Sequence, residues 1–154
     1  NNEMDDFSAK PGVPNLYGAI GGDANAIVPG KRPLSSMTPT IVTKDGKLFM
    51  VVGTPGGTTI ITSVFQVITN VIDFDMDMTA ATHAKRFHSQ WLPDELYLEK
   101  GATNEATRKK LQSMGHKVVE WPGIGQVESI LVRKDGKLEG AADIRAKDDA
   151  VMGY

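Results

Sequence analysis

Two runs of β-branched and other apolar residues are joined by an Asp-Gly turn at two places in the chain. Residues 40–43 and 48–52 flank the first turn, and residues 128–133 and 137–141 flank the second. Asp-Gly favours the positive φ angles that tight hairpin turns require. The pattern therefore predicts two antiparallel hairpins.

Between residues 60 and 72 the apolar side chains recur every three or four positions. This spacing is typical of a helix with a wide buried face, although the many β-branched residues lower its intrinsic propensity. A shorter helix is predicted over residues 78–85, with Thr79 as its N-cap.

A third helix is predicted between a polar N-cap and a glycine at its C-terminal end. Thr103 or Asn104 provides the N-cap, and Gly115 suits the end of the helix. Strands are predicted on both sides, at residues 95–99 and 117–120. Together with the hairpins, these elements indicate an α+β domain with a mainly antiparallel sheet.

Two segments show no clear helical or strand periodicity in their hydrophobic residues. Residues 1–31 are rich in Gly, Pro, Asn and Asp, and residues 86–93 form an aromatic loop. A long stretch without regular structure inside a compact domain is usually functional or disordered. The opening segment is therefore the first place to look for a binding site.

Composition narrows the class of protein. The chain of 154 residues fits a single domain over 1–154. Its 17 Lys and Arg against 19 Asp and Glu give a formal net charge of -2, which disfavours nucleic acid or an anionic membrane as a partner. The longest apolar run, residues 48–52, is far too short for a membrane span. With no cysteine, disulfides, thiolate metal sites and cysteine nucleophiles are excluded.

Two polar clusters could hold a charged small molecule. Glu3, Asp5 and Asp6 could bind a metal or an ammonium group, or could simply form an acidic terminus. Ser35 and Ser36 could donate to a carboxylate, although adjacent serines are more often turn or cap residues. On these residues alone, both interpretations of each cluster stay open.

A glycine loop separates the first hairpin from the first helix. Gly56 and Gly57 lie in it, without the lysine of a Walker loop or the G-x-G-x-x-G spacing. Two successive glycine amides near a helix start can approach a carbonyl oxygen closely, as in an oxyanion hole. A tight strand-to-helix turn is an equally open interpretation.

The remaining residues form no recognisable catalytic set. His83, His88 and His116 share no metal-ligand spacing, and we expect them to be structural. No metal or cofactor site is predicted. Because no activated nucleophile or G-x-S-x-G elbow is found, catalysis is not visible in these residues alone.

Taken together, these segments resemble the small subunit of bacterial γ-glutamyltranspeptidases. The likeness runs from one end of the chain to the other, with five motifs in the family's order. They are residues 1–7, residues 31–40, the Thr54-Pro55-Gly56-Gly57 loop, residues 86–96, and the closing Asp148-Asp149 to Gly153-Tyr154.

The resemblance implies an N-terminal nucleophile hydrolase fold, an αββα sandwich, from a precursor that cleaves itself into a large and a small subunit. In the family the nucleophile is the new N-terminal threonine, a few dozen residues before the segment that matches Asn1. Asn1 has no hydroxyl or thiol to replace it. We therefore expect the C-terminal majority of a small subunit, without its N-terminal strand or strands and inactive by itself.

The resemblance also implies roles for residues that hold the substrate head group. Glu3 and Asp6 match the acidic positions that bind the α-amino group of the γ-glutamyl moiety, and carboxylates suit an ammonium with three donors. Ser35 and Ser36 match the pair that binds the α-carboxylate, together with an arginine of the large subunit.

Further roles follow from the same resemblance. Gly56 and Gly57 match the oxyanion-hole glycines, while Asn2 and Met37 flank the site and are expected to support it. The implied reaction moves a γ-glutamyl group from glutathione, glutamine or a similar compound, through a γ-glutamyl-enzyme intermediate, to water or an amino acid. No cofactor is implied, the large subunit is the expected partner, and the expected location is the periplasm or the outside of the cell.

Two positions depart from the family pattern. Many bacterial members have an arginine where this chain has Thr59, which leaves charge pairing near the site open. Many also have Asp-Pro-Arg where this chain has Ile144 between Asp143 and Arg145. The second departure concerns a turn, because isoleucine lacks the fixed φ of proline.

Two alternative functions remain. One is a related acylase or a poly-γ-glutamate depolymerase, against which the acidic and serine clusters argue because a glutaryl substrate lacks an α-amino acid head group. The other is a non-catalytic γ-glutamyl-binding module. For the isolated chain we predict self-association through exposed sheet edges and apolar surface.

Overall fold

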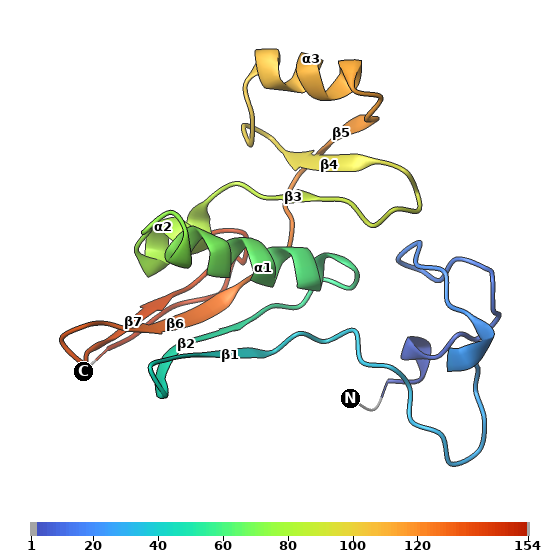
Figure 1. Ribbon diagram of the computed structural model, residues 1–154, viewed down its shortest axis with the longest axis horizontal. Coiled ribbons are helices and arrows are strands. Elements are labelled where there is room, and N and C mark those ends of the chain that lie inside the picture. The colour runs from blue at the N-terminus through green and yellow to red at the C-terminus, as the bar shows by residue number, and fades with distance from the viewer. Residues whose placement is uncertain (1–2, 154) are drawn as a thin grey trace.

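Figure 1 shows a computed structural model of the chain, which describes residues 3–153. Its elements in chain order are the 3₁₀ turns η1 (Met4–Asp6) and η2 (Asp23–Asn25), β1 (Thr40–Lys44), β2 (Lys47–Gly53), α1 (Thr59–Ile72), α2 (Met78–His83), β3 (Phe87–His88), β4 (Leu96–Glu99), α3 (Glu105–Ser113), β5 (Val118–Trp121), β6 (Glu128–Val132) and β7 (Leu138–Ala141).

The main sheet has four antiparallel strands in the order β1-β2-β6-β7. It contains both predicted hairpins, and at the turn of the first Asp45 and Gly46 have φ angles of 52° and 73°. Gly136 has a φ of 82° at the second turn. The Asp-Gly turns therefore do what the sequence predicts, since these φ angles are costly for most other residues.

Helices α1 and α2 cover one face of this sheet (Figure 1). The predicted apolar spacing puts one stripe of α1 against the strands, as expected for a helix with a buried face. The buried core lies between the two layers and consists of Met50, Val52, Val64, Val67, Val71, Met78, Ala81, Val127 and Ala141.

The opposite face of the main sheet carries apolar side chains and is exposed. Ile41, Val51 and Ile130 lie directly opposite one another across β1, β2 and β6. Their exposed fractions are 70%, 38% and 45%. One helix layer on one sheet with a free apolar face is half of an αββα sandwich. In the complete sandwich, another sheet packs on that face.

A second, three-stranded sheet has the order β3-β4-β5. Its β4 and β5 are parallel and are joined through α3, so this part is a βαβ unit. The aromatic loop predicted at residues 86–93 is wrong at Phe87–His88, which form β3 and pair with β4. A two-residue strand is too short to show an alternating pattern, and pairing with a neighbour decides it.

The helix ends confirm one of two predicted caps. Asn104 is the N-cap of α3 and accepts a hydrogen bond from the Thr107 N–H, and Gly115 has a φ of 98° just beyond the helix. Thr79 as the N-cap of α2 is wrong, because Asp77 caps it and accepts from the Ala80 N–H. A carboxylate two residues earlier supplies the same acceptor.

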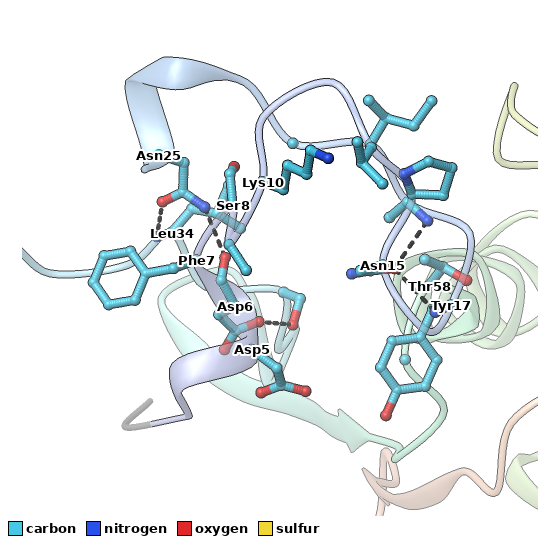
Figure 2. A pocket seen from close by; sticks show the side chains of 18 residues that line it. Asp5, Asp6, Phe7, Ser8, Lys10, Asn15, Tyr17, Asn25, Leu34 and Thr58 are labelled. Carbon is cyan, nitrogen blue, oxygen red and sulfur yellow. Dashed lines mark hydrogen bonds between the residues drawn. The ribbon is translucent and has the colours of Figure 1, made fainter. Parts of the chain in front are cut away.

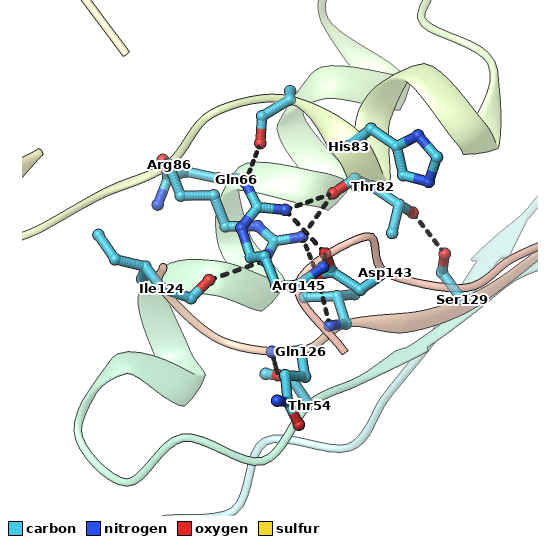
Figure 3. A network of polar contacts seen from close by, with 12 residues as sticks. Thr54, Gln66, Thr82, His83, Arg86, Ile124, Gln126, Ser129, Asp143 and Arg145 are labelled. Atoms are coloured by element: carbon cyan, nitrogen blue, oxygen red, sulfur yellow. Dashed lines mark hydrogen bonds and ion pairs between the residues drawn. The ribbon is translucent and has the colours of Figure 1, made fainter. Parts of the chain in front are cut away.

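Three buried charged residues, Arg86, Glu99 and Asp143, and the partly buried Arg145 connect the two sheets, and Figure 3 shows Arg86, Asp143 and Arg145. Arg86 Nη2 lies 2.7 Å from Asp143 Oδ2, and Arg145 Nη1 lies 2.8 Å from Asp143 Oδ1. Arg145 Nε lies 2.5 Å from Glu99 Oε1 at the end of β4. Burial alone raises the pKa of Asp143, but hydrogen bonds from the Val127 N–H and from Arg145 hold it below its ordinary value.

The opening segment, residues 3–39, contains no strand of either sheet in the part of the chain that the structure describes. It holds η1, η2 and two isolated bridges, as predicted for an irregular stretch, and lies beside the helix and sheet layers (Figure 1). Across residues 3–153, no helix has both the length and the apolar character needed to cross a bilayer.

Candidate functional site

The glycine loop between β2 and α1 has a backbone that only glycine adopts easily. Gly56 and Gly57 have φ angles of 143° and 56°. A Cβ at Gly57 would lie 2.6 Å from the ring of Tyr17, and one at Gly56 would lie 2.6 Å from Thr59 Oγ1. Conformation and close approach therefore both require glycine at these positions.

The N–H groups of Gly56 and Gly57 have no hydrogen-bond partner in residues 3–153. The Gly56 and Gly57 carbonyls accept from the Thr59 and Ile60 N–H groups as α1 begins, whereas the N–H groups of the two glycines donate to no group that the structure describes. Such amides near a helix start suit a carbonyl oxygen that gains negative charge.

The acidic and serine clusters meet, although 30 residues separate them. Ser36 Oγ donates to Asp6 Oδ1 at 2.7 Å (Figure 2). Asn25 holds the two segments together, because its Nδ2 donates to the Asp6 carbonyl at 2.7 Å and its Oδ1 accepts from the Leu34 N–H at 3.0 Å. In the sequence, the only signal for Asn25 is its place among turn residues.

A cleft of about 460 Å³ brings the predicted residues together. Its lining includes Glu3, Ser36 and Met37 from the opening segment and Gly56 and Gly57 from the glycine loop. No Lys or Arg lies among the described residues that line this cleft, while the Glu3 carboxylate does. The cleft therefore suits a ligand with a cationic group and a carbonyl near the glycines.

Other predicted residues lie around this cleft. Asp6 lines an adjoining cavity of about 330 Å³, to which Ser36 and Gly57 also belong. Ser35 is exposed and lines neither space. Asn2 lies outside the described residues, so its predicted supporting role stays a prediction.

Tyr17 is the main residue of the site that the sequence analysis missed. Its ring packs against Gly57, and it borders both the cleft and the adjoining cavity. Asn15 fixes the turn, because its Oδ1 accepts from the N–H groups of Tyr17 and Ala19 at 2.9 and 3.0 Å (Figure 2). An Asn followed three residues later by Gly was a turn signal, but nothing local showed where the ring would pack.

Thr59, the first departure from the family pattern, makes a hydrogen bond to the glycine loop. Its Oγ1 donates to the Gly56 carbonyl at 2.8 Å. The short hydroxyl thus ties the glycine loop to α1 through a neutral hydrogen bond.

The histidines have protein partners or face solvent. His88 lies between Thr62 and Gln90, His83 Nε2 lies 3.0 Å from the Ala142 carbonyl oxygen, and His116 is exposed. Among residues 3–153, no group of three His, Cys, Asp or Glu is arranged to hold a metal ion.

Comparison with known proteins identifies the family. The sequence pattern described as Gamma-glutamyltranspeptidase matches residues 1–153. The chain belongs to the γ-glutamyltranspeptidase family. It is 57% identical over 154 residues to the glutathione hydrolase proenzyme of Escherichia coli (strain K12), covering 100% of this chain and 26% of that protein. The chain thus spans about a quarter of the length of this relative.

Solved γ-glutamyltranspeptidases share the fold. A mutant of the Helicobacter pylori enzyme superposes with a TM-score of 0.89 at 54% identity, over 95% of this chain and 80% of that one. The Pseudomonas nitroreducens enzyme complexed with L-DON gives 0.87 at 44% identity, over 100% of this chain and 81% of that one. The α+β fold is therefore the N-terminal nucleophile hydrolase type found in this family.

Proposed function

We propose that this chain is the substrate-binding and oxyanion-hole part of a γ-glutamyl transferase and hydrolase that acts on glutathione and other γ-glutamyl compounds. The observation that supports this most directly is the single cleft that Glu3, Ser36, Gly56 and Gly57 share. These residues come from three separate segments, and each suits a different part of a γ-glutamyl group.

The head group binds at the acidic and serine side of the cleft. Glu3 and Asp6 accept hydrogen bonds from the substrate α-ammonium, as ionised carboxylates accept without donating. Ser36 Oγ donates to Asp6, so the serine pair and the acidic cluster lie next to each other and can bind adjacent groups of one substrate. When substrate binds, Ser36 turns its single O–H from Asp6 to the α-carboxylate, and the exposed Ser35, which lines neither space, is the second expected donor.

The chemistry takes place at the glycine side. A threonine of the family type, from the segment before the one that matches Asn1, attacks the γ-carbonyl carbon, and its own amine takes the hydroxyl proton. The carbonyl oxygen becomes negative and accepts from the Gly56 and Gly57 N–H groups. Collapse breaks the C–N bond, the leaving amine takes the proton, and water or an amino acid then attacks the acyl-enzyme.

Steady-state kinetics of the intact precursor's processed product test this function. We expect turnover of γ-glutamyl-p-nitroanilide, and for Asp6→Asn a rise in KM of about tenfold or more, because a charge-assisted hydrogen bond of about 1.5–3 kcal/mol is lost. Asp23→Asn is the matched control and leaves KM unchanged, because Asp23, in η2, lines neither the cleft nor the adjoining cavity.

Other results would point to other functions. Equal turnover of γ-glutamyl and glutaryl anilides, with no effect of Asp6→Asn, would support an acylase without head-group selection. Glutamate binding without any turnover would support the non-catalytic module. Both outcomes contradict the proposal.

We further propose that the chain works with a large subunit from the same self-cleaving precursor, exported to the periplasm or beyond. The free apolar face of the main sheet supports a partner sheet, and the proenzyme names of the relatives support a precursor. The N-terminal sequence and intact mass of the natural small chain, with cell fractionation, test this. We expect an N-terminal threonine and a copurifying larger chain.

A further inference from the structure

Gln90 lies between two segments that meet at the glycine loop, and its amide uses both donors and both acceptor positions. Its Nε2 donates to the Tyr17 carbonyl at 2.9 Å and to the Leu92 carbonyl at 3.0 Å. Its Oε1 accepts from Thr58 Oγ1 at 2.6 Å and lies 2.9 Å from His88 Nε2. A half-buried amide with four bonds has one favourable orientation.

These bonds also fix the orientation of His88. Both carbonyl oxygens need a donor, so the NH₂ group of Gln90 must face them and its oxygen must face His88. His88 Nε2 is then the donor to Gln90. In the neutral ring Nδ1 accepts from Thr62 Oγ1, 2.8 Å away on α1. Gln90 is thereby tied to the helix whose start carries the glycine loop.

The two protein groups that Gln90 holds both adjoin Gly57. Thr58 is the next residue along the chain, and the ring of Tyr17 packs directly on Gly57. A shift of Gln90 would therefore move the peptide that follows Gly57 and the ring that covers it. Neither hydrogen bond involves Glu3 or Asp6, so although Tyr17 also borders the cleft, the main expected effect is on the glycine amides.

We propose that Gln90 is a positioning residue that holds the Gly56 and Gly57 amides in the geometry that stabilises the developing oxyanion. This inference rests on the proposed function of the same glycine loop. The oxyanion exists only in the transition state and intermediates, so misplaced amides lower kcat more than they raise KM. A misplacement near 1 Å can cost about a hundredfold in rate, and a smaller shift costs less.

The test compares Gln90→Met with Gln66→Met in the processed, assembled enzyme. Gln66 is the matched control, because its side chain also bridges two elements: its Nε2 donates to the Thr62 and Phe87 carbonyls at 2.8 Å each and its Oε1 accepts from the Phe87 N–H. It touches neither Thr58 nor Tyr17 in any bond given by the structure. Methionine keeps the length of glutamine and removes the hydrogen bonds.

We expect Gln90→Met to lower kcat for γ-glutamyl-p-nitroanilide about tenfold or more per active site, with KM changed less than about threefold. Gln66→Met should lower the midpoint of thermal unfolding about as much as Gln90→Met does, but it should leave kcat within about twofold of the parent. Equal kcat values in the two variants, or a rise in KM at unchanged kcat for Gln90→Met, would overturn the proposal.

A second pair of variants decides the matter if Gln90→Met does not fold. Thr58→Val removes only the hydroxyl that donates to Gln90 and keeps the side-chain shape, so kcat should fall several-fold at constant KM. Thr58→Ser restores the hydroxyl and should restore kcat. Full activity of Thr58→Val would overturn the proposal, whereas an inactive unsubstituted enzyme would overturn the proposed function together with it.

Discussion

The pKa of Glu128 is raised by its place at the start of β6. The residue is exposed, but partial desolvation of its carboxyl raises the pKa most, and the hydrogen bond and charge of Asp149 raise it further, to about 7. Glu128 pairs with Gly53 at the end of β2, close to the glycine loop. One residue thus joins the closing segment of the chain to the strand end that carries the site.

This raised pKa makes stability depend on pH. In the unfolded chain the carboxyl ionises near pH 4.5, so its contribution to stability is fully present below that pH and is lost as pH rises through about 7. We expect Glu128→Gln to raise the unfolding temperature relative to the parent more at pH 8 than at pH 4.5. Thermal scans at both pH values measure this, with exposed Glu105→Gln as the control. An equal difference at both pH values would contradict the assignment.

At the scale of elements, the buried charge network decides how the two sheets are joined. Arg86 stands just before β3, Glu99 ends β4, and Asp143 and Arg145 follow β7. Ile144 lies between the last two with 59% of its surface exposed, in a turn closed by the Ala146 N–H and the Asp143 carbonyl. The second departure from the family pattern therefore changes the turn residue and keeps both charged neighbours.

Breaking this network should be costly. Asp143→Asn leaves the buried Arg86 without its carboxylate partner, and we expect a loss of about 3–5 kcal/mol in the free energy of unfolding. Lys109→Ala removes an exposed ion pair with Glu105 and should cost less than about 1 kcal/mol. Urea unfolding of the two variants measures both values, and a similar cost for both would contradict the expectation that a buried ion pair is more costly to break than an exposed one.

At the scale of the whole molecule, the free face of the main sheet decides behaviour in solution. Ile41, Val51 and Ile130 form a continuous apolar row across three strands. Such a patch marks an interaction surface, and in this fold its natural cover is a second sheet. Without that cover, another copy of the chain is the available partner.

We therefore expect the isolated chain to self-associate, as the sequence predicts. Light scattering across a wide concentration range should show a rising mean mass, and Ile41→Lys with Ile130→Lys should reduce it, because charges on the face oppose stacking. Met114→Lys is the control, since Met114 is exposed just beyond α3 and away from this face. A monomer at all concentrations would refute the prediction.

The sequence by itself determined the parts that depend on near neighbours. The Asp-Gly hairpins, the apolar stripe of α1 and the Asn104 cap follow from φ preferences, periodicity and side-chain acceptors within a few residues. The family motifs also pointed to Glu3, Asp6, Ser35, Ser36, Gly56 and Gly57 as site residues, and their roles stay predictions.

The tertiary structure alone decided which distant residues meet. It placed Ser36 against Asp6, the ring of Tyr17 on Gly57, and Gln90 between Tyr17 and Thr58, across 30 to 73 residues of chain. A hydrogen bond between such residues leaves no period or spacing in the sequence, because either partner looks like an ordinary turn or loop residue until the fold brings the two together.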